Sequence, residues 1–99
     1  MRYEFHPEAL EEYRQAALWY AERERGLALQ FIAAVEDAIQ RVVEAPVRWR
    51  IIGEDVRRCL TRVFPYAVLY TTETDCLLIV AVMHCSREPN YWTKRVDNR

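Results

Sequence analysis

The sequence predicts an α+β fold in which an antiparallel helical hairpin packs on one face of an antiparallel β-meander. Three observations favour this fold. Charged and aromatic side chains alternate over residues 2–5, and apolar residues recur every three or four positions over residues 7–45. Segments typical of strands lie between residues 56 and 83. With 99 residues, 52% of them hydrophobic and 29% charged, the chain is long enough for one domain with a single core. We therefore expect one domain over residues 1–99, ending in a short C-terminal helix or tail.

The first half of the chain predicts a strand followed by two helices. Residues 2–5 alternate aromatic and charged side chains, as in a short half-buried strand. Pro7 suits the first turn of a helix, which we expect to run to about Arg25 and to stop at Gly26 in a left-handed conformation. A second apolar stripe predicts another helix that ends before Pro46; its members are Ala28, Ile32, Val35, Ile39 and Val42. So short a turn makes the pair antiparallel.

The second half predicts an irregular connection and then three strands. Residues 46–55 have no clear period, with Gly53 as their turn, and strands are expected at 56–63, 66–72 and 76–83. Phe64-Pro65 separates the first two strands, and the short turn 73–75 joins the last two. Residues 76–83 are apolar at almost every position, which indicates a central strand with Ile79 in the core. Residues 89–96 are expected to form a short helix.

Charge is distributed unevenly along the chain. Residues 1–45 hold five arginines against nine acids, a net of −4, whereas residues 46–99 hold nine Lys and Arg against six acids, a net of +3. A basic side of this kind suits an acidic or polyanionic partner, although two ordinary solvated surfaces would give the same totals.

Cysteines and histidines favour neither a disulfide framework nor a metal site. The three cysteines, Cys59, Cys76 and Cys85, are odd in number and widely spaced, so we expect buried, reduced thiols. His6 and His84 are too few for a metal site, and no phosphate-binding loop is present, so we expect neither a metal nor a cofactor. The longest apolar run is too short to cross a bilayer and the N-terminus lacks a signal-peptide core, so no membrane association and a cytoplasmic location are expected.

Two groups of residues stand out as candidate binding groups. Basic residues flank the predicted strands: Arg57, Arg58 and Arg62 flank the first strand of the meander, and Arg87, Lys94 and Arg95 follow its last. The arginines offer guanidinium forks to phosphates or carboxylates, but charges on an edge strand also prevent aggregation. In the tail, Tyr91 and Trp92 would be able to stack on a base or, equally, pack the tail onto the sheet. His84 is expected to cap the strand end rather than to act in catalysis.

The motifs taken together resemble the RelE/ParE toxin superfamily of type II toxin–antitoxin systems. The series runs in order along nearly the whole chain: Phe5-x-Pro7-x-Ala9, Trp19-Tyr20, Phe31, Ala38-Ile39, Pro46, Val56-Arg57-Arg58, Phe64-Pro65-Tyr66-x-Val68-x-Tyr70 and Ala81-Val82-x-His84-x-x-Arg87-x-Pro89-x-Tyr91-Trp92. The resemblance implies a toxin that a cognate antitoxin protein holds inactive. Members divide chiefly into ribosome-dependent mRNA endonucleases, which work without metal, and inhibitors of DNA gyrase.

The residues favour the ParE-like branch over the nuclease branch. Many nucleases carry an arginine after the tyrosine that opens the middle strand, where this chain has Ala67, and another after the last strand, where Cys85 falls. We therefore expect a toxin that blocks DNA gyrase through a target-binding set: Arg57, Arg58, Arg62, Arg87, Tyr91 and Trp92. The alternatives are an mRNA endonuclease acting at the ribosome, with catalytic residues Arg57, Arg58, Arg87, Tyr91 and His84, and a non-toxic remnant that still binds its antitoxin.

The antitoxin is expected to cover apolar surface on the helical hairpin. Long helices that carry aromatic side chains on several sides cannot bury all of them against one small sheet. Trp19 and Leu27 are the candidate antitoxin-binding residues.

Overall fold

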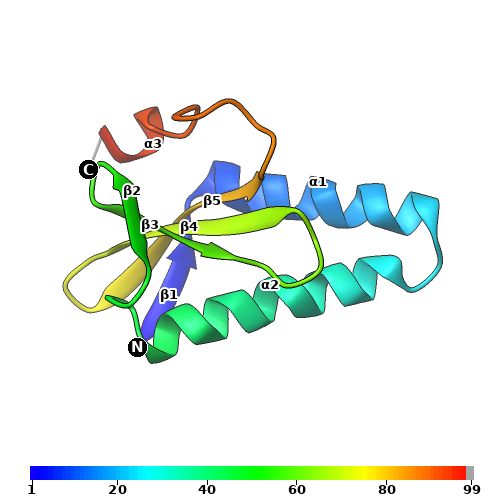
Figure 1. Cartoon of the computed structure of the whole chain (residues 1–99), viewed down its shortest axis with the longest axis horizontal. Helices are drawn as coiled ribbons and strands as arrows, with labels where there is room; N and C mark the ends of the chain where they lie inside the picture. Colours follow the sequence, from blue (N-terminus) through cyan, green and yellow to red (C-terminus); the bar gives the residue numbers. More distant parts are fainter. Residues whose placement is uncertain (98–99) are drawn as a thin grey trace.

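The computed structural model describes residues 1–97, and it confirms the predicted α+β architecture (Figure 1). The chain order is β1 (Arg2–Phe5), α1 (Pro7–Arg23), α2 (Leu27–Glu44), β2 (Arg50–Gly53), β3 (Val56–Leu60), β4 (Tyr66–Thr72), β5 (Cys76–His84) and α3 (Lys94–Asp97). The five strands form one sheet in the order β1-β5-β4-β3-β2. All neighbouring strands are antiparallel except β1 and β5, which are parallel.

The sheet has a hydrophobic cluster on each face. On one face the hairpin of α1 and α2 packs its buried side chains, Phe31 and Val35 among them, against Val68 and Ile79. On the other face Trp92 and Val96 from the C-terminal segment pack on buried residues of β3, β4 and β5. The sheet is thus covered by helices on one side and by Trp92 and Val96 on the other, which explains why β4 and β5 carry buried residues on both faces.

The hairpin has the local features that its sequence predicts. The Nδ1 atom of His6 accepts the backbone N–H of Glu8 at 3.1 Å, and Pro7 follows as the first helical residue. Gly26 has a φ of 85° directly before α2, a conformation that glycine adopts without steric cost. The end of the hairpin that carries this turn extends beyond the sheet (Figure 1), and side chains there have less surface to pack against.

Three segment boundaries differ from the prediction. Residues 46–55 are not wholly irregular, since Arg50–Gly53 form the edge strand β2, which pairs with β3. Strand β3 ends at Leu60 rather than at residue 63, because the Thr61 hydroxyl donates to the carbonyls of Phe64 and Tyr66 and closes a turn. The final helix is shorter than predicted and spans Lys94–Asp97, with hydrogen-bonded turns before it.

The cysteine prediction is correct in part. All three thiols are free and Cys59 is buried, but Cys76 is half-buried and Cys85 is exposed. Cys85 follows the end of β5 at a point where the chain turns away from the sheet, so the prediction of a buried thiol is wrong there. Ile79 is buried in the central strand β5, as predicted.

Candidate binding groove

A groove of about 920 Å³ runs between α1 and the ends of the central strands. Glu8, Glu11 and Glu12 from α1 line one wall, and Arg87 and Arg95 from the C-terminal segment line the other. The rest of the lining is mainly aromatic or apolar: Ala16, Trp19, Tyr20, Pro65, Tyr66 and Val82. The groove therefore offers an apolar floor with opposite charges on its two sides, which suits an amphipathic peptide segment.

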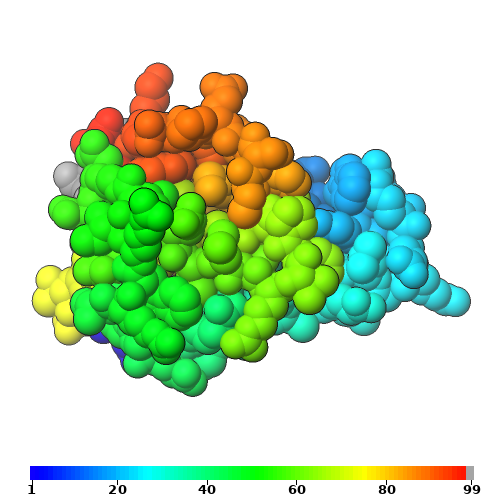
Figure 2. All heavy atoms as spheres, in the orientation of Figure 1, coloured from blue at the N-terminus to red at the C-terminus, as the bar shows by residue number. Residues whose placement is uncertain are grey.

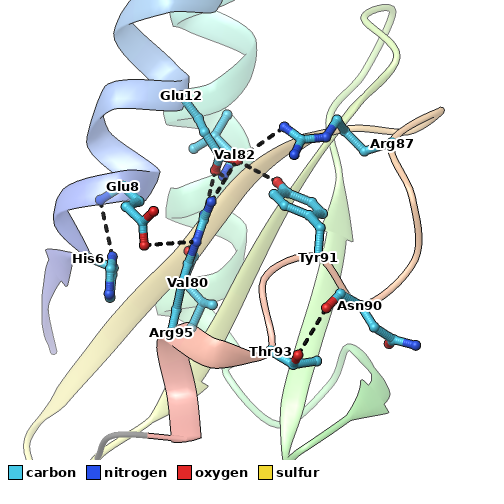
Figure 3. A network of polar contacts seen from close by, with 10 residues as sticks. All are labelled: His6, Glu8, Glu12, Val80, Val82, Arg87, Asn90, Tyr91, Thr93 and Arg95. Atoms are coloured by element: carbon cyan, nitrogen blue, oxygen red, sulfur yellow. Dashed lines mark hydrogen bonds and ion pairs between the residues drawn. The ribbon is translucent and has the colours of Figure 1, made fainter.

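Glu12 is the centre of the polar contacts in this groove (Figure 3). Its carboxylate accepts the Tyr91 hydroxyl at 2.6 Å and two guanidinium N–H groups of Arg95 at 2.8 and 3.1 Å. It also accepts the backbone N–H of Val82 at 3.1 Å. Both charged side chains are largely buried, with 15% of Glu12 and 10% of Arg95 exposed. Such a pair holds because further hydrogen bonds accompany the ion pair: Glu12 also accepts from Tyr91 and Val82, and Arg95 also donates to the carbonyl of Val80.

The Glu12–Arg95 pair occupies the open part of the β5 edge. Strand β1 pairs with β5 only as far as Ile79, so the outward backbone groups beyond that point have no strand beside them. Arg95 donates to the carbonyl of Val80 at 3.0 Å, and Glu12 accepts the N–H of Val82. One ion pair thus satisfies the backbone of β5 and fixes the C-terminal segment against α1.

Arg87 lines the same groove and stacks on Tyr91, which is half-buried beside it. The Arg87 guanidinium lies 3.8 Å from the centre of the Tyr91 ring and 3.9 Å from a carboxylate oxygen of Glu12, and half of its side chain is exposed. Burial and the hydrogen bond to Glu12 raise the pKa of the Tyr91 hydroxyl. The hydroxyl is therefore protonated at neutral pH and directs its proton at Glu12.

The two predicted antitoxin-binding residues lie in different surroundings. Trp19 is half exposed and borders the groove, with the Arg23 guanidinium 3.7 Å from the centre of its ring. Leu27 is only partly exposed and packs against the core under the helices. Trp19 is therefore the more accessible of the two.

The predicted target-binding arginines do not form one cluster. Arg57 points to the helical side of the sheet, where its guanidinium donates to the carbonyls of Val47 at 3.1 Å and Trp49 at 2.7 Å. Arg58, the next residue of β3, points to the opposite face. Arg62 lies in the turn after β3, exposed and 3.7 Å from the carboxylate of Asp37. Of the predicted target-binding residues, only Arg87 lines the groove, and Tyr91 lies beside it because the Arg87 guanidinium stacks on its ring.

Trp92 and His84 take packing and capping positions. Trp92 is 1% exposed and packs in the core beneath the C-terminal segment, which confirms the packing interpretation for this residue and leaves no ring face for stacking on a base. The Nδ1 atom of His84 accepts the backbone N–H of Ser86 at 3.1 Å and lies 2.7 Å from its hydroxyl oxygen, as expected for a residue that caps a strand end.

Sequence reasoning missed the central role of Glu12 and Arg95. Glu12 resembles its acidic neighbours at the start of a helix, where the macrodipole favours any carboxylate. Its partner Arg95 lies 83 residues further along the chain, and no periodicity reports a pairing over that distance.

Within residues 1–97 no group of three or more His, Cys, Asp or Glu side chains is placed to hold a metal ion. None of the described helices has the length and apolar character needed to cross a membrane.

Comparison with known proteins supports the resemblance. The family model described as "ParE toxin of type II toxin-antitoxin system, parDE" matches residues 3–89. No curated protein matches the chain. Among solved structures, one from the "Chromosomal ParDE TA system from P. aeruginosa" superposes with a TM-score of 0.62 at 12% identity, over 85% of this chain and 95% of that chain; at that identity the likeness shows the fold. The match to the family model covers most of the chain, from within β1 to beyond the end of β5, and the chain belongs to the ParE toxin family of type II toxin–antitoxin systems.

Proposed function

We propose that this protein is a toxin that inhibits growth by binding and blocking DNA gyrase, and that a cognate antitoxin neutralises it by occupying the groove between α1 and the C-terminal segment. The observation that carries the proposal is that Trp19 and Arg87 line the same groove. A peptide segment that covers Trp19 would also cover Arg87, so binding of the antitoxin would remove a target-binding residue from solvent.

The charges and shape of the groove fit a protein segment as its occupant. An amphipathic helix or strand would place apolar side chains on Trp19, Tyr20 and Tyr66, and its own charges would meet Glu11 on one wall and Arg87 on the other. Aromatic and arginine side chains are the residues that most often dominate binding energy at such interfaces.

The geometry favours blocking over RNA cleavage. General acid–base cleavage of RNA needs side chains that converge on one phosphate, but Arg57 and Arg58 lie on opposite faces of β3 and Arg57 donates to backbone carbonyls. Tyr91 donates to Glu12, and the same contact raises its pKa, which disfavours it as a base. Of the residues in the nuclease alternative, His84 and Arg87 line the groove together and Arg87 stacks on Tyr91. Arg57 and Arg58 do not line it, and Tyr91 is bonded to Glu12, so the five side chains do not converge on one phosphate.

Induction in cells without antitoxin tests the proposal. A gyrase blocker should induce DNA-damage signalling and filamentation while protein synthesis initially continues. Translation arrest within minutes, with mRNA cut at defined codon positions, would instead identify a ribosome-dependent nuclease. Normal growth at verified expression levels would identify a non-toxic remnant that only binds the antitoxin.

A further inference from the structure

Two arginines lie directly opposite each other on the face of the sheet away from the helices. Arg50 of β2 is the register partner of Arg58 of β3. Residues in this relation share one face, with Cβ atoms about 4.5–5.5 Å apart, and like charges placed so are destabilising. The pair is therefore an unfavourable arrangement for the isolated chain.

Neither arginine has a carboxylate partner within residues 1–97. The ion pairs of the described chain use other arginines, namely Arg14, Arg23, Arg41, Arg62, Arg87 and Arg95. Arg57, which precedes Arg58 and points to the other face of the sheet, donates to two backbone carbonyls. Arg50 and Arg58 thus present guanidinium groups whose mutual repulsion an external anion would relieve.

Apolar side chains border the pair on the same face. The next row of the sheet runs through Leu60, Ala67 and Met83; Leu60 is half exposed and Met83 half-buried. Partial desolvation raises the pKa of the Cys85 thiol, and the positive charge of Arg58 acts in the opposite direction, so Arg58 lies near Cys85. Figure 2 shows β2, the β3–β4 turn and the C-terminal segment around this face, in green, yellow-green and orange. The open edge of β2 borders it, since β2 is the last strand of the sheet.

We propose that Arg50 and Arg58 form a carboxylate-binding subsite for an acidic, apolar-flanked segment of the target protein; the identity of that target rests on the proposed function. Two adjacent guanidinium forks bind carboxylates in paired hydrogen bonds. Leu60 and Met83 then receive the apolar side chains that flank the acidic residue. This subsite lies on the sheet face, apart from the groove lined by Trp19, and it adds Arg50 to the target-binding residues while leaving Arg57 out.

Protein carboxylates fit this surface better than the phosphates of a nucleic acid. The chain has a net charge of −1 and a pI near 6.1, whereas nucleic-acid-binding domains are usually strongly basic. Single-stranded nucleic acids also need exposed aromatic rings for stacking. The two aromatic side chains that pack on this face are Trp92, which is buried, and Tyr91, which is bonded to Glu12.

The test compares the double variant R50Q/R58Q with the charge-matched control R2Q/R25Q. The control removes two exposed arginines at the first strand and at the α1–α2 turn. Circular dichroism and antitoxin binding establish that both variants are folded. Affinity for intact gyrase is then measured at low and high salt. We expect the affinity of R50Q/R58Q to fall about tenfold or more, since hydrogen bonds to charged groups are stronger than those between neutral groups, and that of R2Q/R25Q to stay within about twofold. The loss should shrink at high salt.

A second arm tests the subsite without gyrase. A peptide of alternating Glu and Leu is titrated into the toxin while the arginine Nε–Hε signals are followed by NMR. We expect shifts of the Arg50 and Arg58 signals, and none with the corresponding Lys–Leu peptide.

The outcomes separate the two proposals. If wild-type toxin does not bind gyrase but the Glu–Leu peptide shifts both signals, the gyrase assignment fails and the subsite remains. If R50Q/R58Q binds gyrase like the control, or loses antitoxin and gyrase binding equally, the subsite does not serve the target. Tighter binding of a single-stranded oligonucleotide than of the peptide at these arginines would overturn the assignment to a protein partner.

Discussion

Glu12 shows how one side chain fixes the position of a whole segment. Its carboxylate accepts hydrogen bonds from the Tyr91 hydroxyl, the Arg95 guanidinium and the backbone N–H of Val82. Glu12→Gln keeps the shape but removes the nearer counter-charge of the mostly buried Arg95 and leaves it only the carboxylate of Glu8 at 3.6 Å; buried charges that lose a partner are strongly destabilising. We expect a loss of about 2–4 kcal/mol in the free energy of unfolding, measured by urea denaturation. Glu11→Gln is the matched control, because its pair with Arg14 is exposed, and its urea midpoint should not change. Equal stability of both variants would contradict the role of Glu12.

Tyr70 makes stability depend on pH in the alkaline range. Burial raises its pKa to about 12, and its hydroxyl donates to the carbonyl of Pro46 at 2.5 Å. The folded state therefore favours the neutral phenol, and the unfolded chain loses its proton near the ordinary pKa of about 10. This contribution to stability is complete below pH 10 and is lost as the pH rises from 10 through 12. Urea midpoints at pH 8 and pH 11 should differ less in Tyr70→Phe than in wild type; an unchanged difference would assign the effect to other tyrosines.

At the scale of elements, the stability of the fold depends most on the central strand β5. It pairs with β1 and β4 and lies between the two hydrophobic clusters. Ile79→Asp would bury an unpaired charge there, and we expect it to cost several kcal/mol and to unfold the domain. Leu29→Asp on α2, where the leucine is 72% exposed, should leave the protein folded. Circular dichroism separates the two variants, and a stable Ile79→Asp protein would show that the strand has been wrongly placed.

Periodicity predicted the elements that bury a regular apolar stripe and missed those held by partners distant in the sequence. Both helices have such stripes and β5 is a continuous apolar run, so their bounds were close to the prediction. Strand β2 exists because β3 offers it hydrogen bonds, and its four residues are too few to show a period. The groove was likewise only half predicted. The sequence indicated Trp19 as an apolar side chain that a helix cannot bury and Arg87 as a charged side chain after a strand. Nothing in the sequence indicated that the two lie in one groove. Their meeting depends on the packing of α1 against β5 and on the Glu12–Arg95 pair.

At the scale of the whole molecule, the antitoxin should stabilise the fold by mass action. A partner that binds only the folded toxin adds about 2.7 kcal/mol when its free concentration is a hundred times its Kd. Co-expression with the cognate antitoxin should therefore raise both solubility and the thermal midpoint. Trp19→Ala should reduce that gain while changing the stability of the isolated toxin little, since the side chain is half exposed. An unchanged gain would place the antitoxin outside the groove.

Arg87 should contribute part, but not all, of the affinity for the target. It is half exposed and stacks on Tyr91, and removing one charged contact from an interface typically costs about 1–3 kcal/mol. Arg87→Ala should therefore weaken gyrase inhibition without abolishing it. Complete loss of toxicity, with antitoxin and ribosome binding intact, would indicate lost transition-state stabilisation and support a nuclease instead.

The most direct measurement is a supercoiling assay with purified gyrase, relaxed plasmid and this protein, with and without the antitoxin. We expect the wild-type protein to inhibit supercoiling and the antitoxin to restore it. With Trp19→Ala, inhibition should persist but more antitoxin should be needed to reverse it. Unimpaired supercoiling at a large excess of folded protein, together with mRNA cleavage in a parallel reaction containing ribosomes, would contradict it.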